Sequence, residues 1–167
     1  TVVIRLLNSG AGLLPLDQML LSTRNLDTFE RLLRRPQGLV IVTGPTGSGT
    51  TTTLYAALNY LKSPTKKVVT VEYPIECQMA GVTQMQIQPT AGVTFADGLR
   101  SILKQDPDVI MVGELRDRET AHIAVAAAQA GDLPLAAPRT NDVATSIPRI
   151  LDLGVDPHQL TSALTGV

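Results

Sequence analysis

The 167-residue sequence is short of cysteine, aromatic residues and net charge, and each shortage excludes a class of protein. A single cysteine, Cys77, excludes an intramolecular disulfide and fits a reducing compartment. The 14 basic and 15 acidic residues nearly balance, and aromatic residues make up 3%, so no basic stripe interleaved with aromatic side chains is available for nucleic acid. No apolar run approaches membrane-spanning length. We therefore expect a soluble, cytoplasmic protein with no nucleic-acid partner and no direct membrane insertion.

What the sequence does contain is a strand, a glycine-rich loop and a helix in direct succession. Leu39–Thr43 is an apolar, β-branched run typical of a strand buried on both faces. It leads into Gly44–Gly49, and Leu54, Leu58 and Leu61 follow at helical spacing. A phosphate-binding loop needs this context, because loop N–H groups surround the anion and the helix N-terminus adds partial positive charge.

One residue departs from the phosphate-loop motif. The full pattern is G-x-x-x-x-G-K-[ST], and here Gly44 and Gly49 are followed by Thr50 and Thr51. Thr51 offers the hydroxyl that binds Mg²⁺ in this motif, but Thr50 stands where the lysine belongs. Without that lysine, an ordinary glycine-rich turn remains the alternative interpretation.

The remaining pattern predicts an α/β protein with a mostly parallel sheet and helices on both faces, because buried strands alternate with helices. The predicted helices are one carrying Leu26–Leu33 capped by Ser22, one opened by Thr94 with Asp97, one over Arg118–Ala130 capped by Asp117, one around Ile147–Leu153 with Pro148 in its first turn, and one over Gln159–Leu164. The predicted strands are Thr1–Leu7, Val68–Val71, the half-exposed Val82–Gln88, Val109–Val112, and a fourth core strand near Leu133–Ala137.

Prolines and the chain ends modify this prediction. Pro134 and Pro138 each remove a backbone donor, so we expect the fourth strand to be short, irregular or displaced to an edge. The chain begins at a threonine and ends in an apolar helical pattern, so we expect a fragment. Residues 1–21 are interpreted as a remnant of an upstream domain with its linker, and residues 22–167 as the core.

Three carboxylates follow the predicted buried strands at their carboxyl ends. Glu72 and Glu76 follow the second strand, and Glu114 follows the third, so all three are expected to face the glycine-rich loop. Asp108 precedes its strand and belongs at the opposite edge. Acidic side chains gathered at the carboxyl ends of the strands favour a functional site over a solvated surface.

These motifs together resemble the motor ATPases of type II secretion and type IV pilus assembly. The resemblance is carried by Gly44–Gly49, Thr70–Glu76, Gln105–Asp117 and Thr140–Asp142, and extends over nearly the whole chain. It implies a RecA-like P-loop core, ATP and Mg²⁺ as cofactors, a homo-hexamer formed with an upstream domain, and inner-membrane secretion or pilus platform proteins as partners at the cytoplasmic face.

The resemblance also implies roles for individual residues. Glu76 would be the general base for the attacking water, and Glu114 the acidic residue that ends the Walker B strand. Thr51 would bind Mg²⁺. The residues expected to bind nucleotide are Gly44, Pro45, Thr46, Gly47, Ser48, Gly49, Thr50, Thr51 and Thr52.

The departures from the family pattern fall mostly at this chemistry. Besides Thr50, Tyr73 replaces an aspartate of the acidic box, and Asp132 and Arg139 stand at both positions of the histidine box. His122 and His158 lie outside that box and are interpreted as surface residues, and Cys77 as a partly buried thiol. Three hypotheses stay open: an impaired ATPase, a pseudo-ATPase acting as a structural or nucleotide-sensing subunit, and sequence errors or engineered changes in an active parent. A RecA-type nucleic-acid translocase is the weaker alternative.

Overall fold

The computed structural model describes residues 13–167. The strand predicted over Thr1–Leu7 lies outside this range. In chain order the elements are η1 (Leu16–Gln18), α1 (Thr23–Leu33), β1 (Leu39–Ile41), α2 (Thr50–Leu61), β2 (Val68–Glu72), β3 (Thr83–Gln86), η2 (Pro89–Ala91), α3 (Phe95–Leu103), β4 (Val109–Leu115), α4 (Arg118–Ala130), β5 (Leu133–Pro138), α5 (Val143–Asp152), α6 (Pro157–Ala163) and β6 (Leu164–Gly166), where η marks a short 3-10 turn.

The strands of the described residues form a single sheet in the order β3-β2-β4-β5-β1-β6. Every neighbouring pair is parallel, which confirms the predicted α/β class. The strand expected to be half-exposed is β3, and it lies at one edge with no fully buried residue. Parallel strands need crossover connections, so the helices come to lie on the two faces of the sheet.

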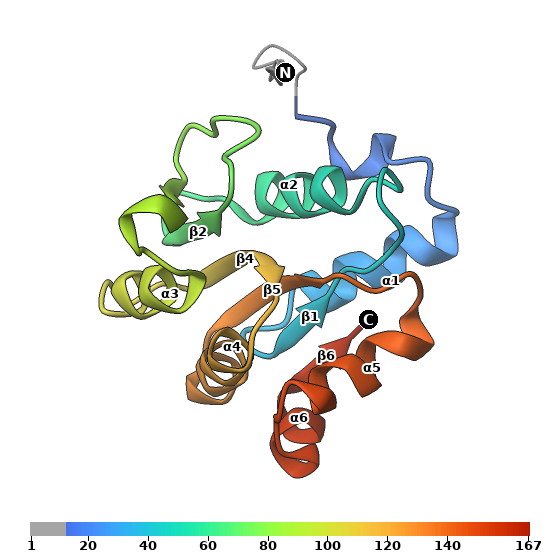
Figure 1. The fold of residues 1–167 in the computed structure, drawn as a ribbon. Helices are drawn as coiled ribbons and strands as arrows, with labels where there is room; N and C mark the ends of the chain where they lie inside the picture. Colours follow the sequence, from blue (N-terminus) through green and yellow to red (C-terminus); the bar gives the residue numbers. More distant parts are fainter. Residues whose placement is uncertain (1–12) are drawn as a thin grey trace, which may run out of the picture.

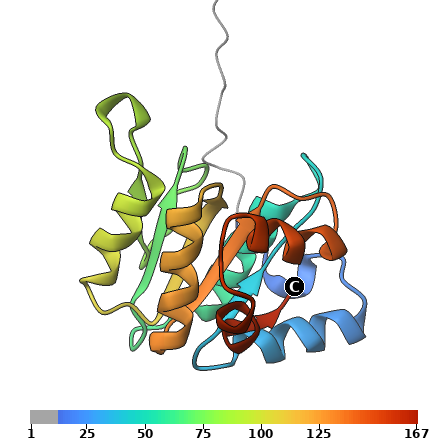
Figure 2. The same ribbon diagram turned by 60° about the horizontal axis from the view of Figure 1, so that its bottom comes forward.

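Each face of the sheet has its own hydrophobic core. Successive strand residues point to opposite faces, so Val68 and Val69 belong to different cores. One core joins the strands to η1, α1 and α2, and the other joins them to α3, α4, α5 and α6. In Figures 1 and 2, α2 covers one face while α3 and α4 lie against the other. The four inner strands, β2, β4, β5 and β1, are thereby buried on both faces, as their apolar sequences predict.

Three helices begin at the caps that the sequence predicts. Ser22 accepts a hydrogen bond from the backbone N–H three residues on, and Asp117 does the same at the start of α4. Thr94 and Asp97 form a reciprocal capping box at the start of α3. These caps depend on side chains within one turn of each helix, which explains why local sequence predicts them well.

The predicted displacement of the fourth core strand to an edge is wrong, although its pairing with β4 is irregular between Val112 and Leu115, as one of the expected alternatives has it. β5 lies inside the sheet between β4 and β1 and pairs with both, despite containing Pro134 and Pro138. The N–H of Leu133 donates to the Asp108 carbonyl on the β4 side, whereas the Ala136 carbonyl accepts from the chain just after β1. Successive residues therefore alternate between neighbours, and Pro134 directs its missing donor toward β1, a strand of three residues. Pro138 faces the same side and is the last residue of β5, so its missing donor costs the sheet little.

Two further predictions near the end of the chain are corrected. Helix α5 begins at Val143, capped by Asp142, so Pro148 lies inside the helix and not in its first turn. Helix α6 ends at Ala163, and Leu164–Gly166 forms strand β6 beside β1 instead of continuing the helix. The apolar spacing of Leu160 and Leu164 suits a helix, but pairing with the free edge of β1 takes precedence.

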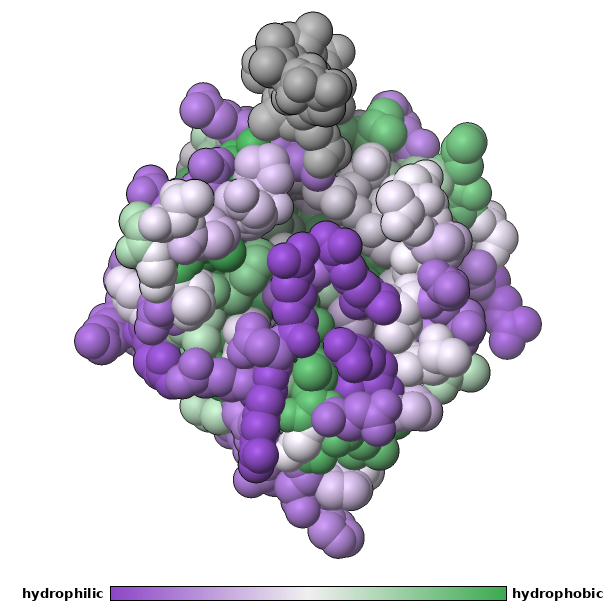
Figure 3. All heavy atoms as spheres, in the orientation of Figure 1, coloured by the Kyte–Doolittle hydropathy of each residue, from purple (hydrophilic) through white to green (hydrophobic). Residues whose placement is uncertain are grey.

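No helix among residues 13–167 is both long enough and apolar enough to span a bilayer. Figure 3 shows one face of the molecule, on which hydrophilic side chains interrupt the hydrophobic ones.

Candidate functional site

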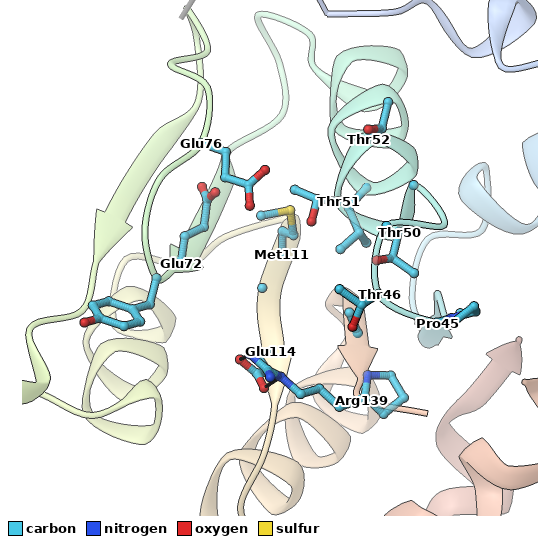
Figure 4. A pocket seen from close by; sticks show the side chains of 18 of the residues that line it. Pro45, Thr46, Thr50, Thr51, Thr52, Glu72, Glu76, Met111, Glu114 and Arg139 are labelled. Atoms are coloured by element: carbon cyan, nitrogen blue, oxygen red, sulfur yellow. Dashed lines mark hydrogen bonds and ion pairs between the residues drawn. The ribbon is translucent and has the colours of Figure 1, made fainter. Parts of the chain in front are cut away.

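A cavity of about 510 Å³ opens where β1, β2, β4 and β5 end. This position follows the rule that ligands of parallel α/β sheets bind beyond the carboxyl ends of the strands. All of the predicted loop residues except Ser48 line the cavity, as do Glu72, Glu76, Glu114 and Arg139. In Figure 4 the threonines of the loop and of α2 lie opposite Glu72 and Glu76, with Glu114 and Arg139 nearby.

The glycine-rich loop has the backbone of an anion-binding loop. Gly49 precedes α2 with φ of 97°, a left-handed conformation that side-chain-bearing residues rarely adopt. A Cβ on Gly44 would collide with the hydroxyl of Ser48, which folds back inside the loop and away from the cavity. Within the described chain, the N–H groups of Thr50, Thr51 and Thr52 have no acceptor. These donors point out of the helix N-terminus beside the cavity, where they can bind an anion.

Side-chain hydroxyls at the start of α2 also lack a partner among residues 13–167. Neither Thr50 nor Thr51 makes a side-chain hydrogen bond to any described residue, whereas the Thr53 hydroxyl donates to the Gly49 carbonyl at 3.0 Å. Thr51 can therefore offer its oxygen to a cation in the cavity. Thr50 can offer a hydroxyl but no positive charge.

Glu72 lines the cavity but is fully engaged inside the protein. Its side chain is 3% exposed, and it accepts hydrogen bonds from Tyr55, from Thr70 at 2.5 Å and from Gln84 at 3.1 Å. Burial, reinforced by the neighbouring Glu72 carboxylate, raises the pKa of the Tyr55 hydroxyl well above its ordinary value. Glu72 therefore serves the structure of this wall and is not available for chemistry.

Tyr55 ties helix α2 to the loop that carries Glu76. Its hydroxyl oxygen accepts hydrogen bonds from the backbone N–H of Glu76 at 3.1 Å and of Cys77 at 3.3 Å, while donating to Glu72. Glu76 itself is half-buried at the cavity wall. No sequence pattern indicates this role, because a tyrosine on the buried face of a helix is indistinguishable from a core residue.

Glu114 faces the cavity between two arginines. Its carboxylate forms ion pairs with Arg116 and Arg139, and Arg139 also donates from Nη2 to Oε2 at 3.2 Å. The buried Oε1 lies against both guanidinium groups, yet no described residue gives it a hydrogen bond of good geometry. The side chain of Arg139 is 74% exposed and that of Glu114 11%, so the pair lies at the mouth of the site.

The segment after β5 is fastened to the glycine-rich loop. The carbonyl of Thr140 accepts from the backbone N–H of Gly44 at 3.2 Å and from the Thr43 hydroxyl at 2.8 Å. The hydroxyls of Thr43 and Thr140 also share a hydrogen bond of 2.6 Å. Arg139 is thereby anchored directly beside the loop.

Other residues named from the sequence lie elsewhere. Asp132 directly precedes β5 at the opposite end of the strands, where burial, and then Asp106 and Asp108, raise its pKa. His158 is exposed, as predicted, but His122 is half-buried, with Nε2 enclosed and without a hydrogen bond to described residues, so its interpretation as a surface residue is corrected. Cys77 is a partly buried free thiol, as expected.

Comparison with known proteins identifies the family. The model of the family described as "Type II/IV secretion system protein" matches residues 1–167. The chain belongs to this family. It is 48% identical over 166 residues to the type II secretion system ATPase E of Vibrio cholerae, and 49% identical over 166 residues to the type II secretion system protein HxcR of Pseudomonas aeruginosa. Each alignment covers 99% of this chain, and 33% and 35% of the two relatives, so the chain spans about a third of their length.

A solved structure of the family has the same fold. The pilus retraction motor PilT, solved with bound ADP, superposes with a TM-score of 0.81 at 34% identity, covering 94% of this chain and 48% of that one. The resemblance inferred from the motifs, and the RecA-like fold that it implies, are therefore confirmed.

Proposed function

We propose that this chain is the nucleotide-binding core of a secretion-system motor ATPase, and that its cavity binds ATP together with Mg²⁺. The observation that carries the proposal is the set of unpaired N–H groups at the start of α2, which open into a cavity whose other walls carry Glu76 and Glu114. A helix N-terminus of this kind is suited to a phosphate group. On this proposal Gly44–Gly49 and Thr50–Thr52 surround the phosphates, and residues 22–167 form the ATPase core.

Each side chain then has a role that its surroundings allow. The unpaired hydroxyl of Thr51 would bind Mg²⁺, which takes oxygen ligands and keeps several waters, so that one hydroxyl together with phosphate oxygens suffices. Bound there, the ion would supply positive charge at the phosphates. Glu76, whose backbone N–H donates to the Tyr55 hydroxyl, would act as the general base that activates water. Glu114 would be the acidic residue of the opposite wall.

Thr50 limits what the cavity does. A hydrogen bond to a charged group contributes roughly 1.5–3 kcal/mol. A loop with threonine in place of the motif's lysine should therefore bind ATP about 10- to 100-fold more weakly than a loop that has the lysine. The catalytic cost is larger, because a comparable cation at a transferring phosphate contributes about 10³–10⁵ in rate. We therefore propose weak ATP binding and strongly reduced hydrolysis.

The second candidate is a pseudo-ATPase that serves as a structural or nucleotide-sensing subunit. Two observations favour it: Thr50 brings no charge to the phosphates, and Glu114 is paired with two arginines. For the full-length protein, either candidate entails a homo-hexamer at the cytoplasmic face of the inner membrane, in contact with secretion or pilus platform proteins.

The decisive experiment restores the missing charge. ATP affinity and steady-state hydrolysis are measured with Mg²⁺ for the parent chain, for Thr50→Lys and for Thr50→Lys with Tyr73→Asp. We expect Thr50→Lys to tighten ATP binding about 10- to 100-fold and to restore little turnover, because Tyr73 still neighbours the loop of Glu76. The control is Thr161→Lys, which adds the same charge at an exposed position of α6 and should leave ATP affinity unchanged.

Either alternative outcome is informative. Full turnover by Thr50→Lys alone would rule out the pseudo-ATPase candidate. An affinity that Thr50→Lys leaves unchanged would mean that the glycine-rich loop is not a phosphate site, and the nucleotide assignment would then fail.

A further inference from the structure

The cavity is poor in positive charge for a site that receives a polyphosphate. Three carboxylates line it, those of Glu72, Glu76 and Glu114, while Arg139 is the only lysine or arginine among its described lining residues. Thr50 adds no charge. Of the lining side chains in residues 13–167, an anion that enters this space therefore meets one cation, and that cation does not come from the glycine-rich loop.

Arg139 is positioned to reach the same anion as the loop. Its neighbour Thr140 is fastened to Thr43 and Gly44 by three hydrogen bonds of 2.6–3.2 Å, so the backbone at Arg139 is fixed against the loop's first glycine. From this anchor the side chain crosses the cavity mouth toward Glu114, as Figure 4 shows. Arg139 lines the same cavity as the loop residues, so its guanidinium and the loop can contact one bound anion.

The present partner of Arg139 can release it. The side chain of Arg139 is 74% exposed, so water solvates its guanidinium when it leaves Glu114, whose own side chain is 11% exposed. Glu114 retains Arg116 when Arg139 leaves, so no buried charge is stranded. A phosphate group, by contrast, accepts two parallel hydrogen bonds from a guanidinium and carries more negative charge than a carboxylate.

We propose that Arg139 is a phosphate-binding residue of this cavity, and that it supplies from the end of β5 the positive charge that the loop lacks at Thr50. In the structure its guanidinium pairs with Glu114, and on nucleotide binding it transfers to the terminal phosphate. This inference rests on the proposed function, since it presupposes that a nucleotide occupies the cavity.

The test measures the affinity of the 167-residue chain for ATP and for AMP by calorimetry, with Arg139→Gln as the principal variant. We expect ATP affinity to fall about 10- to 100-fold and AMP affinity to change less than twofold, because AMP has no terminal phosphate to contact. Arg139→Lys, which keeps the charge and loses the fork of donors, should retain part of the affinity. Lys66→Gln, an exposed charge in the loop before β2, controls for the change in net charge.

Two further variants locate the effect. With Thr50→Lys present, Arg139→Gln should cost clearly less, because the two cations serve the same phosphates. Arg116→Gln removes the other arginine on Glu114, so a loss equal to that of Arg139→Gln would mean that both act through Glu114, and the proposal would be wrong. Thermal unfolding of each variant checks that the exposed substitution leaves the fold intact.

Other results would also overturn the proposal. Unchanged ATP affinity in Arg139→Gln excludes phosphate binding by this residue, and increased affinity would make it a competitor that blocks the site. If the parent binds ATP and Arg139→Gln binds equally well, only this inference fails. If neither the parent nor Thr50→Lys binds ATP, the proposed function fails as well.

Discussion

Replacing Tyr55 with phenylalanine should destabilise the protein far more than the loss of one oxygen atom suggests. The hydroxyl lies inside the protein, donates to the Glu72 carboxylate and accepts from the backbone N–H groups of Glu76 and Cys77. Its removal leaves a carboxylate that is 3% exposed short of one donor, while Thr70 and Gln84 still hold the other oxygen. Two loop amides lose their acceptor at the same time.

The size of the effect follows from the charge on Glu72. A hydrogen bond to a charged group contributes about 1.5–3 kcal/mol, so we expect Tyr55→Phe to lower the free energy of unfolding by about 2–3 kcal/mol. For a domain of this size, each kcal/mol shifts Tm by about 2–4 °C, which gives a fall of roughly 4–12 °C. Urea denaturation measures the free energy and differential scanning calorimetry measures Tm.

Tyr60 provides the matched control, because it lies on the same helix and its hydroxyl also meets charged partners. It accepts from Arg34 at 2.7 Å and donates to Glu30 at 3.2 Å, near the surface. Tyr60→Phe should cost less than about 1 kcal/mol, since exposed polar contacts contribute little. Equal losses in Tyr55→Phe and Tyr60→Phe would refute the argument that the buried Glu72 depends on its tyrosine.

Two further predictions concern stability away from the cavity. Burial, and then the charges of Asp106 and Asp108, raise the pKa of Asp132. The neutral form of Asp132 therefore stabilises the fold at pH values below the unfolded pKa of about 3.8. This contribution is lost as the pH rises through the raised, folded-state pKa. Asp132→Asn should therefore raise Tm at pH 7 but not at pH 3, unlike exposed Asp27→Asn; a gain at both pH values would contradict the assignment. Pro148 lies exposed inside α5 and cannot donate a hydrogen bond to the carbonyl four residues earlier. Pro148→Ala should therefore raise the free energy of unfolding, measured by urea denaturation, by about 1–3 kcal/mol. A lower urea midpoint in the variant would show that α5 requires the proline.

Sequence predicted those parts of the fold that short segments decide. Ser22, Thr94 and Asp117 cap their helices through contacts within one turn, and the apolar runs of β2 and β4 exclude solvent-exposed strands. The placement of β5 could not be predicted, because the cost of a proline depends on which neighbour its missing donor faces. That neighbour follows from register, which is a property of the assembled sheet.

The candidate site divides in the same way. The glycine-rich loop is contiguous, and its spacing alone indicated the residues that line the cavity, with Ser48 as the exception. The hydrogen bonds of Tyr55 to Glu72, and the ion pair of Arg139 with Glu114, join residues on different elements. No spacing rule predicts such pairs, because they depend on how helices and loops are placed over the sheet.

Strand β6 gives the last residues of the chain a direct mechanical connection to the loop. β6 is hydrogen-bonded to β1 in parallel register, and β1 runs into Thr43 and Gly44 without an intervening turn or helix. The pairing of β6 with β1 has a register irregularity between Leu39 and Val40, so a displacement of β6 acts first on the strand that leads into the loop. Movement of the loop and movement of Leu164–Gly166 are therefore coupled through β1.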